Sequence, residues 1–568
     1  MIIPPIVQQR PEWLSAFCSR FNPTDAELEP FTRAHPDNWR RFLQLSEVMW
    51  AGRQRMGCFA GAGISAAYGF PTWYDFLHRA AERMGLLDRV APLLAEKRYE
   101  HAAQRLWDHD RNRLQEIILE TFDHEKITPE VQGVAPLLPF LRFNLLVSTN
   151  FDWVLEHAFR AGGLDPRPTV YGASTALALS AAQRRLLPLL KIHGDYLVDE
   201  NRVFTRRQYE EHYSRASPLF GHLVELFSST AFLFVGFSLQ DRKIRKALRR
   251  ARQAGSAQHF AILPAASETD AEERDEYYTR LGVLPLWYVG DHDVVGSVLG
   301  LLASGGEMGP RMVEVARALR ADDLGRALSA TGHLVRERTE CHVFRMARAW
   351  SLVESVELAR CAVDQDYADQ AVSRVDEAYG TVEGFADAHV AKAVINHLRF
   401  NLTDAYDNLT RAIDEGAGLS LEARLMRGLY RFQFRGDMDG ALEDFTTVLQ
   451  SRPQGADRDW IELYVAWIRT RRGEKDALAQ LRAVLVRPAL AGELRGALLL
   501  VRIVEPLYRI GFVRNFVTRS LRDRPRRDRL VTRTLVRAGR SGIVGMVLRW
   551  QGRRRAREAE GRRGPSGS

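Results

Sequence analysis

The chain has 568 residues, too many for one ordinary domain core, and its 46% hydrophobic content is enough to build several cores. No segment resembles a signal peptide, and no run is long and apolar enough to span a membrane, so we expect a cytoplasmic protein without a transmembrane segment. The four cysteines lie far apart and form no Cys-x-x-Cys pair. This spacing argues against a zinc ribbon and against a disulfide framework.

The net charge of +9 is concentrated at the C-terminal end of the chain. From Arg514 onward there are 17 arginines against four acidic residues, so residues 514–568 carry +13 and residues 1–513 carry −4. An Arg-rich tail of this kind could bind nucleic acid or an acidic membrane surface. A solvated arm without a partner is the alternative interpretation.

Short helical patterns interrupted by prolines fill residues 1–50 and predict a helical lead-in. Residues 51–303 then alternate between apolar runs and helical periodicity, which predicts an α/β domain with a doubly wound, Rossmann-like parallel sheet. The helical stretches include Trp73–Met84, Asp152–Ala161 and Asp241–Gln253. The predicted strands are Met56–Ala60, Phe143–Ser148, Leu187–Ile192, Phe232–Phe237, His259–Leu263 and Leu284–Val289.

Glycines at residues 304–312 predict a linker, and residues 313–513 predict an all-α, tetratricopeptide-like solenoid. The segment Gly436–Phe445, with Pro453 after it, resembles the second helix of such a repeat. Small residues recur 34 to 36 positions apart at Ala371, Ala405, Ala441 and Ala477, with partners seven positions on at Ala378, Ala412, Val448 and Val484. Small residues let paired helices approach closely, as stacked helix pairs require. An irregular helical domain is the alternative.

Two polar clusters follow the first two predicted strands. The run Gly61-Ala62-Gly63-Ile64-Ser65-Ala66 is expected to open a helix, where glycines let the backbone approach a pyrophosphate. Glycines that serve only a tight turn are the alternative. Asn150 and Asp152 come directly after the second run, although both residue types are also ordinary helix caps.

Two further clusters follow later strands. Lys191-Ile192-His193-Gly194-Asp195 ends one apolar run, and Gly236-Phe237-Ser238 ends another. A histidine on its own is more often structural than catalytic, but ligands of doubly wound sheets bind at the carboxyl ends of the strands. Four clusters at such positions therefore indicate one ligand site.

The four clusters together with Gly69-Phe70-Pro71 occur in the order of the sirtuin family and resemble it over about residues 55–260. The resemblance implies that NAD is the substrate. Gly61, Ala62, Gly63 and Ser65 would then cradle its phosphates. Asn150 and Asp152 would hold the nicotinamide and its ribose, His193 would be the general base, and Gly236 and Ser238 would line the adenosine side.

Two departures separate the chain from sirtuin deacylases. No four-cysteine zinc module follows His193-Gly194, so no metal is expected, and Tyr74 stands where the deacylase pattern has arginine. Thr205 and Gln208 instead form a capping box that predicts a helix start. This passage resembles the sirtuin-like domains of bacterial antiphage-defence proteins and implies an NAD hydrolase. An NAD-dependent protein deacylase and a non-catalytic module that senses NAD or ADP-ribose are the alternatives.

The expected chemistry needs few groups. Nicotinamide leaves its ribose as a neutral molecule, so no acid need protonate it. An amide oxygen from Asn150 could position water, and His193, with an ordinary pKa of about 6.5, suits a base near neutral pH. Because uncontrolled NAD loss would kill the host, we expect control by homo-oligomerisation or by a phage or partner protein bound to the repeats. The product, ADP-ribose or a cyclic form, stays open.

Overall fold

The computed structural model describes residues 12–52, 54–127, 133–170, 187–198, 202–214, 217–255, 257–361, 364–382, 385–399, 401–417, 420–451 and 456–485. The chain divides into two compact units, Arg10–Ser351 and Leu352–Ser568 together with Met1–Gln9. This division falls within helix α17 (His342–Glu354). The predicted boundaries at residues 51, 304, 313 and 514 stay predictions, and the Arg-rich tail lies outside the described residues.

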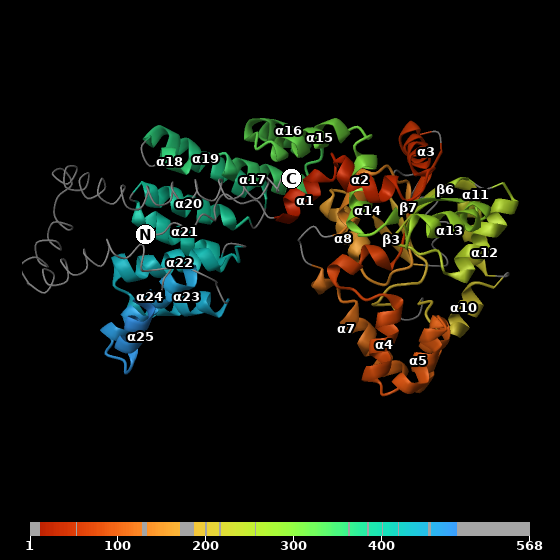
Figure 1. Ribbon diagram of the computed structural model, residues 1–568, viewed down its shortest axis with the longest axis horizontal. Helices are drawn as coiled ribbons and strands as arrows, with labels where there is room; N and C mark the ends of the chain where they lie inside the picture. The colour runs from red at the N-terminus through yellow and green to blue at the C-terminus, as the bar shows by residue number, and fades with distance from the viewer. Residues whose placement is uncertain are drawn as a thin grey trace, which may run out of the picture. The chain divides into compact units, whose positions relative to one another are not determined.

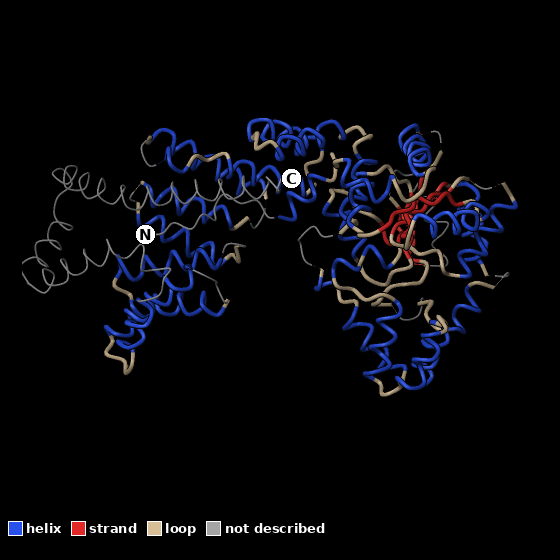
Figure 2. Tube along the Cα trace, in the orientation of Figure 1, coloured by secondary structure: helices blue, strands red, loops and turns tan. Residues whose placement is uncertain are grey.

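The first unit is built on a seven-stranded parallel sheet in the order β3-β4-β2-β1-β5-β6-β7. Figure 2 shows the strands together, surrounded by helices. The strands are β1 (Met56–Ala60), β2 (Leu145–Ser148), β3 (Arg167–Val170), β4 (Pro188–Lys191), β5 (Ala231–Val235), β6 (His259–Ala265) and β7 (Val283–Val289). This sheet confirms the predicted fold class, and each of the six predicted runs overlaps a strand.

The prediction missed β3, an edge strand that reads Arg-Pro-Thr-Val. Its polar and proline content hides it, because proline is tolerated at a sheet edge but is rare in central strands. In the centre of the sheet the pattern is plain, since all five residues of β1 and of β5 are buried. The ring of Phe59 on β1 packs against those of Phe232 and Phe234, two further residues of this core.

Helices of this unit begin close to where the sequence predicts them. Asp241 caps α12 by accepting from the Lys243 and Ile244 amides, and the predicted capping box of Thr205 and Gln208 is present. The helices are α1 (Glu12–Ser19), α2 (Asp25–Thr32), α3 (Asn38–Ala51), α4 (Trp73–Arg83), α5 (Leu87–Ala95), α6 (Tyr99–His109), α7 (Arg111–Thr121), α8 (Val154–Ala161), α10 (Arg206–His212), α11 (Pro218–Ser229), α12 (Arg242–Gln253), α13 (Glu268–Arg280), α14 (Asp293–Ala303), α15 (Gly309–Arg320), α16 (Leu324–Glu337) and α17.

The glycine run after β1 departs from expectation. It opens two short 3₁₀ turns, Ala62–Ile64 and Ala66–Tyr68, and the first α-helix after it begins only at Trp73. Gly69 has φ +79° and Pro71 follows, so the chain cannot continue as a helix through this loop. The predicted helix N-terminus at residues 61–66 is therefore absent.

Helix α3 packs against the edge of the sheet that β7 forms. Asn38 Nδ2 donates to the Trp287 carbonyl at 2.8 Å, and the Trp287 amide donates back to Asn38 Oδ1 at 3.0 Å. The side-chain amide thus takes the place of a neighbouring strand along β7, whose backbone groups would otherwise lack partners at the sheet edge.

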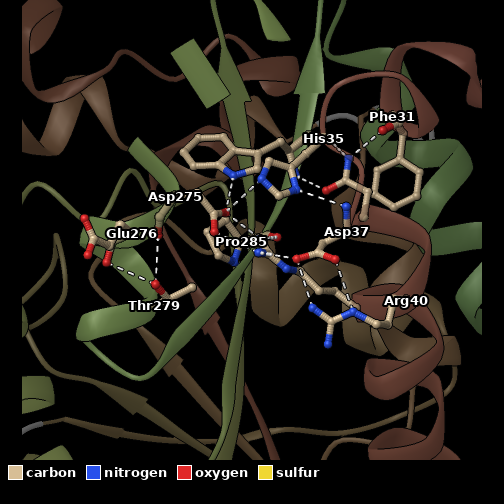
Figure 3. A network of polar contacts seen from close by, with 11 residues as sticks. Phe31, His35, Asp37, Arg40, Asp275, Glu276, Thr279 and Pro285 are labelled. Atoms are coloured by element: carbon tan, nitrogen blue, oxygen red, sulfur yellow. Dashed lines mark hydrogen bonds and ion pairs between the residues drawn. The ribbon is translucent and has the colours of Figure 1, made fainter. Parts of the chain in front are cut away.

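A buried arginine on the same helix reinforces this contact. Arg41 makes two hydrogen bonds to the Asp275 carboxylate, at 2.5 and 2.7 Å, and a third to the Pro285 carbonyl at 3.0 Å. The Trp287 indole also donates to Asp275. Figure 3 shows Asp275 facing His35 and the residues around Asp37. Burial opposes ionisation of Asp275, but the hydrogen bonds from Arg41 and Trp287 outweigh it and lower the pKa of this carboxyl.

Removing the buried Arg41 side chain should weaken the packing of α3 against the sheet. We expect Arg41→Ala to lower the free energy of unfolding of this unit by about 3 kcal/mol, because it strands a mostly buried carboxylate. Arg40→Ala is the matched control, since the Arg40 side chain is 61% exposed and its ion pair among the described residues is with Asp37. Denaturant unfolding followed by tryptophan fluorescence measures both. Equal midpoints for the two variants would contradict the assignment.

The second unit is a succession of helices, coloured green to blue in Figure 1. The predicted small residues Ala371, Ala405, Ala441 and Ala477 are all buried, on alternate helices α19, α21, α23 and α25. Their partners seven positions on are buried too. The helices are α18 (Leu358–Cys361), α19 (Gln365–Thr381), α20 (Asp387–Leu398), α21 (Leu402–Asp414), α22 (Ser420–Tyr430), α23 (Met438–Gln450), α24 (Ala456–Arg471) and α25 (Ala477–Leu485). Each packs on its neighbours in sequence from α19 onward, as a solenoid of helix pairs requires.

Among the described residues, no helix has both the length and the apolar composition needed to cross a membrane.

Candidate active site

The four predicted clusters lie at one edge of the sheet. Ala60 of β1 is in register with Ser148 of β2 and Val235 of β5, and Ser148 is in register with Lys191 of β4. All four strands are parallel and adjacent, so the residues that follow them meet at the same edge. The connections leave β1 toward β2 on one side and later return to β5 on the other. This reversal is the position where doubly wound sheets bind ligands.

The glycines of two loops are in backbone contact. The Gly63 amide donates to the Gly236 carbonyl at 2.9 Å, and a Cβ on Gly63 would lie 2.8 Å from the Gly236 Cα. Gly236 has φ +62°, a conformation that L side chains rarely adopt. These glycines are therefore required for packing between loops. Gly63, Gly236 and Ser238 are also exposed, which leaves them accessible to a ligand.

Ser65 connects the glycine run with the second cluster. Its hydroxyl donates to Asp152 Oδ1 at 3.0 Å and accepts from Asn150 Nδ2 at 3.1 Å. Asn150 Nδ2 also donates to the Gly61 carbonyl at 3.0 Å. Because both bonds use the amide nitrogen, the orientation of the Asn150 side chain is fixed with its oxygen directed elsewhere. Burial raises the pKa of Asp152, although Lys191 and hydrogen bonds to the carboxyl oppose it.

A buried lysine joins the second cluster to the third. Lys191 Nζ donates to the carbonyls of Phe151 and Asp152, at 3.2 and 2.8 Å. It also pairs with Glu156 at 3.0 Å and with Asp195 at 2.7 Å. The lysine side chain is 1% exposed, and the two carboxylates outweigh the effect of burial and raise its pKa. One ammonium thus fixes the loop that carries Asn150 and the loop that carries His193.

Replacing this lysine should destabilise the site and the unit. We expect Lys191→Met to lower the free energy of unfolding by about 3–5 kcal/mol, because the carboxylates of Glu156 and Asp195 lose their buried cation. Lys246→Met, at an exposed position of α12, is the control and should leave stability unchanged. Thermal unfolding of the full chain measures both, and a Lys191→Met midpoint equal to that of wild type would refute the central role of Lys191.

His193 is almost completely buried, at 1% exposure. Its Nε2 lies 2.8 Å from the Tyr213 hydroxyl, while Nδ1 has no hydrogen-bond partner among the described residues. Burial, with a smaller contribution from His212, lowers the pKa of His193 to about 3. The expected value of about 6.5 is therefore wrong for this closed site, since desolvation disfavours the charged ring.

The nearby loop of Tyr68, Gly69, Phe70 and Pro71 borders a separate cavity of about 270 Å³. Apolar rings and the cations Arg79, Arg83 and Lys126 line it, but none of the nine predicted site residues does. Tyr74, which replaces the deacylase arginine, is exposed and stacks on His78. Within the described ranges, no group of three His, Cys, Asp or Glu side chains is placed to hold a metal ion.

Sequence reasoning assigned no role to four side chains that support the predicted ones, namely Lys191, Glu156, Tyr209 and Tyr213. The first two carry a local signal, because Lys191 and Asp195 are four positions apart at a strand end and Glu156 is a carboxylate among the buried residues of α8. The tyrosines carry none, since only the fold brings them to His193.

The sequence of this chain is similar to those of known proteins over a part that contains most of the described site. The model of the SIR2-like domain family matches residues 144–286, which contain β2 to β6 and most of the described site. The chain therefore carries a SIR2-like domain.

Three similar curated proteins are each named NAD(+) hydrolase ThsA. The protein of Acinetobacter baumannii is 27% identical over 229 residues, which is 39% of this chain and 45% of that protein. The protein of Bacillus cereus is 27% identical over 240 residues, 40% of this chain and 48% of that protein. The protein of Cytobacillus dafuensis is 28% identical over 197 residues, 34% of this chain and 37% of that protein. The chain thus spans less than half the length of these relatives.

Proposed function

We propose that the protein is an NAD hydrolase that cleaves the bond between nicotinamide and ribose. The observation that carries the proposal is the placement of Asn150 and His193 after adjacent parallel strands, at the sheet edge where Gly63 and Gly236 are exposed. The similarity of this domain to proteins named NAD(+) hydrolase supports it. We assign phosphate contacts to Gly61, Ala62, Gly63 and Ser65, ribose and nicotinamide contacts to Asp152, and the adenosine side to Gly236 and Ser238.

The reaction needs a positioned water and a proton acceptor. The bond between C1′ and nicotinamide breaks with its electron pair passing to the nicotinamide ring, and a water oxygen bonds to C1′ while its proton is taken up. The amide oxygen of Asn150 can accept from that water, because its amide nitrogen is already bound to Gly61 and Ser65. His193 is neutral in the closed site and so has a ring lone pair to accept the proton, while the burial that lowers its pKa also makes it a weaker base than a free imidazole.

The test is nicotinamide release from NAD by the purified full chain, followed by chromatography. We expect Asn150→Ala and His193→Ala each to reduce the rate by about 100-fold or more. Asn144→Ala and His333→Asn are controls at exposed positions, since Asn144 precedes β2 and His333 lies on α16. Equal NAD loss from all variants would refute the catalytic assignment. Release only with an acyl-lysine peptide would indicate a deacylase, and tight binding without release would indicate a sensor.

For control of the activity we propose an antiphage-defence role in the cytoplasm, in which the helical repeats bind a phage or partner protein and the chain forms a homo-oligomer. The solenoid stack of α19–α25 supports this, because such stacks offer extended surfaces to protein partners. The four cysteines all lie among the described residues and form no disulfide, as a reducing compartment favours. A rate of NAD cleavage per chain that is independent of protein concentration and of added phage protein would contradict the control scheme.

The Arg-rich tail gives a separate prediction. If residues 514–568 bind nucleic acid through their charge of +13, truncation before Arg514 should abolish binding to duplex DNA, and binding by the full chain should weaken steeply with added salt. Fluorescence anisotropy with labelled DNA measures both chains. An affinity that survives truncation would exclude the tail as the binding site.

A further inference from the structure

Two tyrosines enclose the His193 ring. The Tyr213 hydroxyl lies 2.8 Å and the Tyr209 hydroxyl 3.5 Å from His193 Nε2. The two phenol rings stack on each other at 5.5 Å and meet the imidazole edge-on. Tyr209 is 6% and Tyr213 1% exposed, so His193 Nε2 is enclosed by protein groups and turned away from bulk water.

The carboxylate of Asp241 indicates where the protons lie. Asp241 Oδ1 accepts from the Lys243 and Ile244 amides at 2.7 and 3.0 Å, which fixes this carboxylate at the start of α12. The Tyr209 hydroxyl donates to Asp241 Oδ2 at 3.4 Å. Because a hydroxyl has one proton, the Tyr209 oxygen can then only accept from His193. This arrangement favours a hydrogen on Nε2.

The other ring nitrogen points to the same tautomer. His193 Nδ1 is buried and has no hydrogen-bond partner among the described residues. A neutral imidazole carries one N–H and one lone pair, and a buried N–H without an acceptor is costly. The lone pair therefore belongs on Nδ1, the ring nitrogen left without a partner among the described residues.

We propose that Tyr213 and Tyr209 are positioning residues that hold His193 in the Nε2–H tautomer and present Nδ1 as the proton-accepting atom. This inference rests on the proposed NAD hydrolysis. In that reaction the attacking water bonds to C1′ through oxygen, the C1′–N electron pair leaves with nicotinamide, and the water proton goes to Nδ1. Both tyrosine hydroxyls contact His193 Nε2, so the proposed effect of the tyrosines is exerted through His193.

The test measures the His193 tautomer by NMR and the rate of nicotinamide release by kinetics, as two separate readouts. In the full chain labelled with ¹⁵N-histidine, and with the His193 signals assigned by their loss in His193→Gln, we expect a protonated Nε2 and an unprotonated Nδ1. Tyr213→Phe, and more strongly the double variant with Tyr209→Phe, should give a mixture of tautomers. These variants keep both rings and lose only hydroxyls, so we expect the fold to be retained with a modest fall in the thermal midpoint, because the buried His193 Nε2–H loses its acceptor. The kcat for nicotinamide release should fall on the order of tenfold with little change in KM.

Tyr288→Phe is the matched control, because the Tyr288 hydroxyl lies 2.9 Å from His292 Nδ1 in a comparable pair elsewhere in this unit. It should leave both the His193 signals and kcat as in wild type. A protonated Nδ1 in wild type, or a double variant with unaltered His193 signals and kcat, would overturn the inference. Failure of wild type to release nicotinamide would instead overturn the proposed function, while the spectrum still decides the tautomer.

Discussion

A single buried ammonium organises the candidate site. Lys191 Nζ reaches two carbonyls in the loop after β2 and two carboxylates, one on α8 and one in the loop after β4. Removing so many polar groups from water is costly unless each finds a partner, and this cluster satisfies them together. The backbone positions of Asn150 and His193 therefore follow from the charge of one side chain that takes no part in the proposed chemistry.

The opposite half of the site is set by close packing of the two glycine loops. The loops after β1 and β5 touch through Gly63 and Gly236, so neither loop can move far without the other. Ser65 then passes this constraint to Asn150 and Asp152 through its hydroxyl. The ion pairs of Lys191 on one side of β2 and the glycine packing on the other thus hold the Asn150 side chain between them. The candidate binding site at this sheet edge is therefore preorganised before a ligand binds.

The sequence predicts the sheet well because each central strand is a short apolar run buried on both faces, as Met56–Ala60 is. The clusters after these strands were also predictable, because parallel strands bring their carboxyl ends together. Beyond this, prediction fails where contacts are long-range. The run at Gly61–Ala66 lacks its helix because of Gly69 and Pro71 downstream. The lowered pKa of His193 depends on burial, a property that residue spacing does not reveal.

Helix α8 links the site to the helices that follow the sheet domain. Its first turn carries Glu156, which is bound to Lys191. Just beyond its C-terminal end, the Gly162 carbonyl accepts from Arg338 at 3.2 Å, and Gly162 forms a backbone bridge with Cys341. Arg338 also donates to the Pro139 carbonyl at 3.1 Å, so the turn between α16 and α17 is held at two points. Contiguous packed contacts of this kind can couple two distant sites energetically. Here the contacts connect the turn between α16 and α17, through the eight residues of α8, with the loop of Asn150 and Asp152.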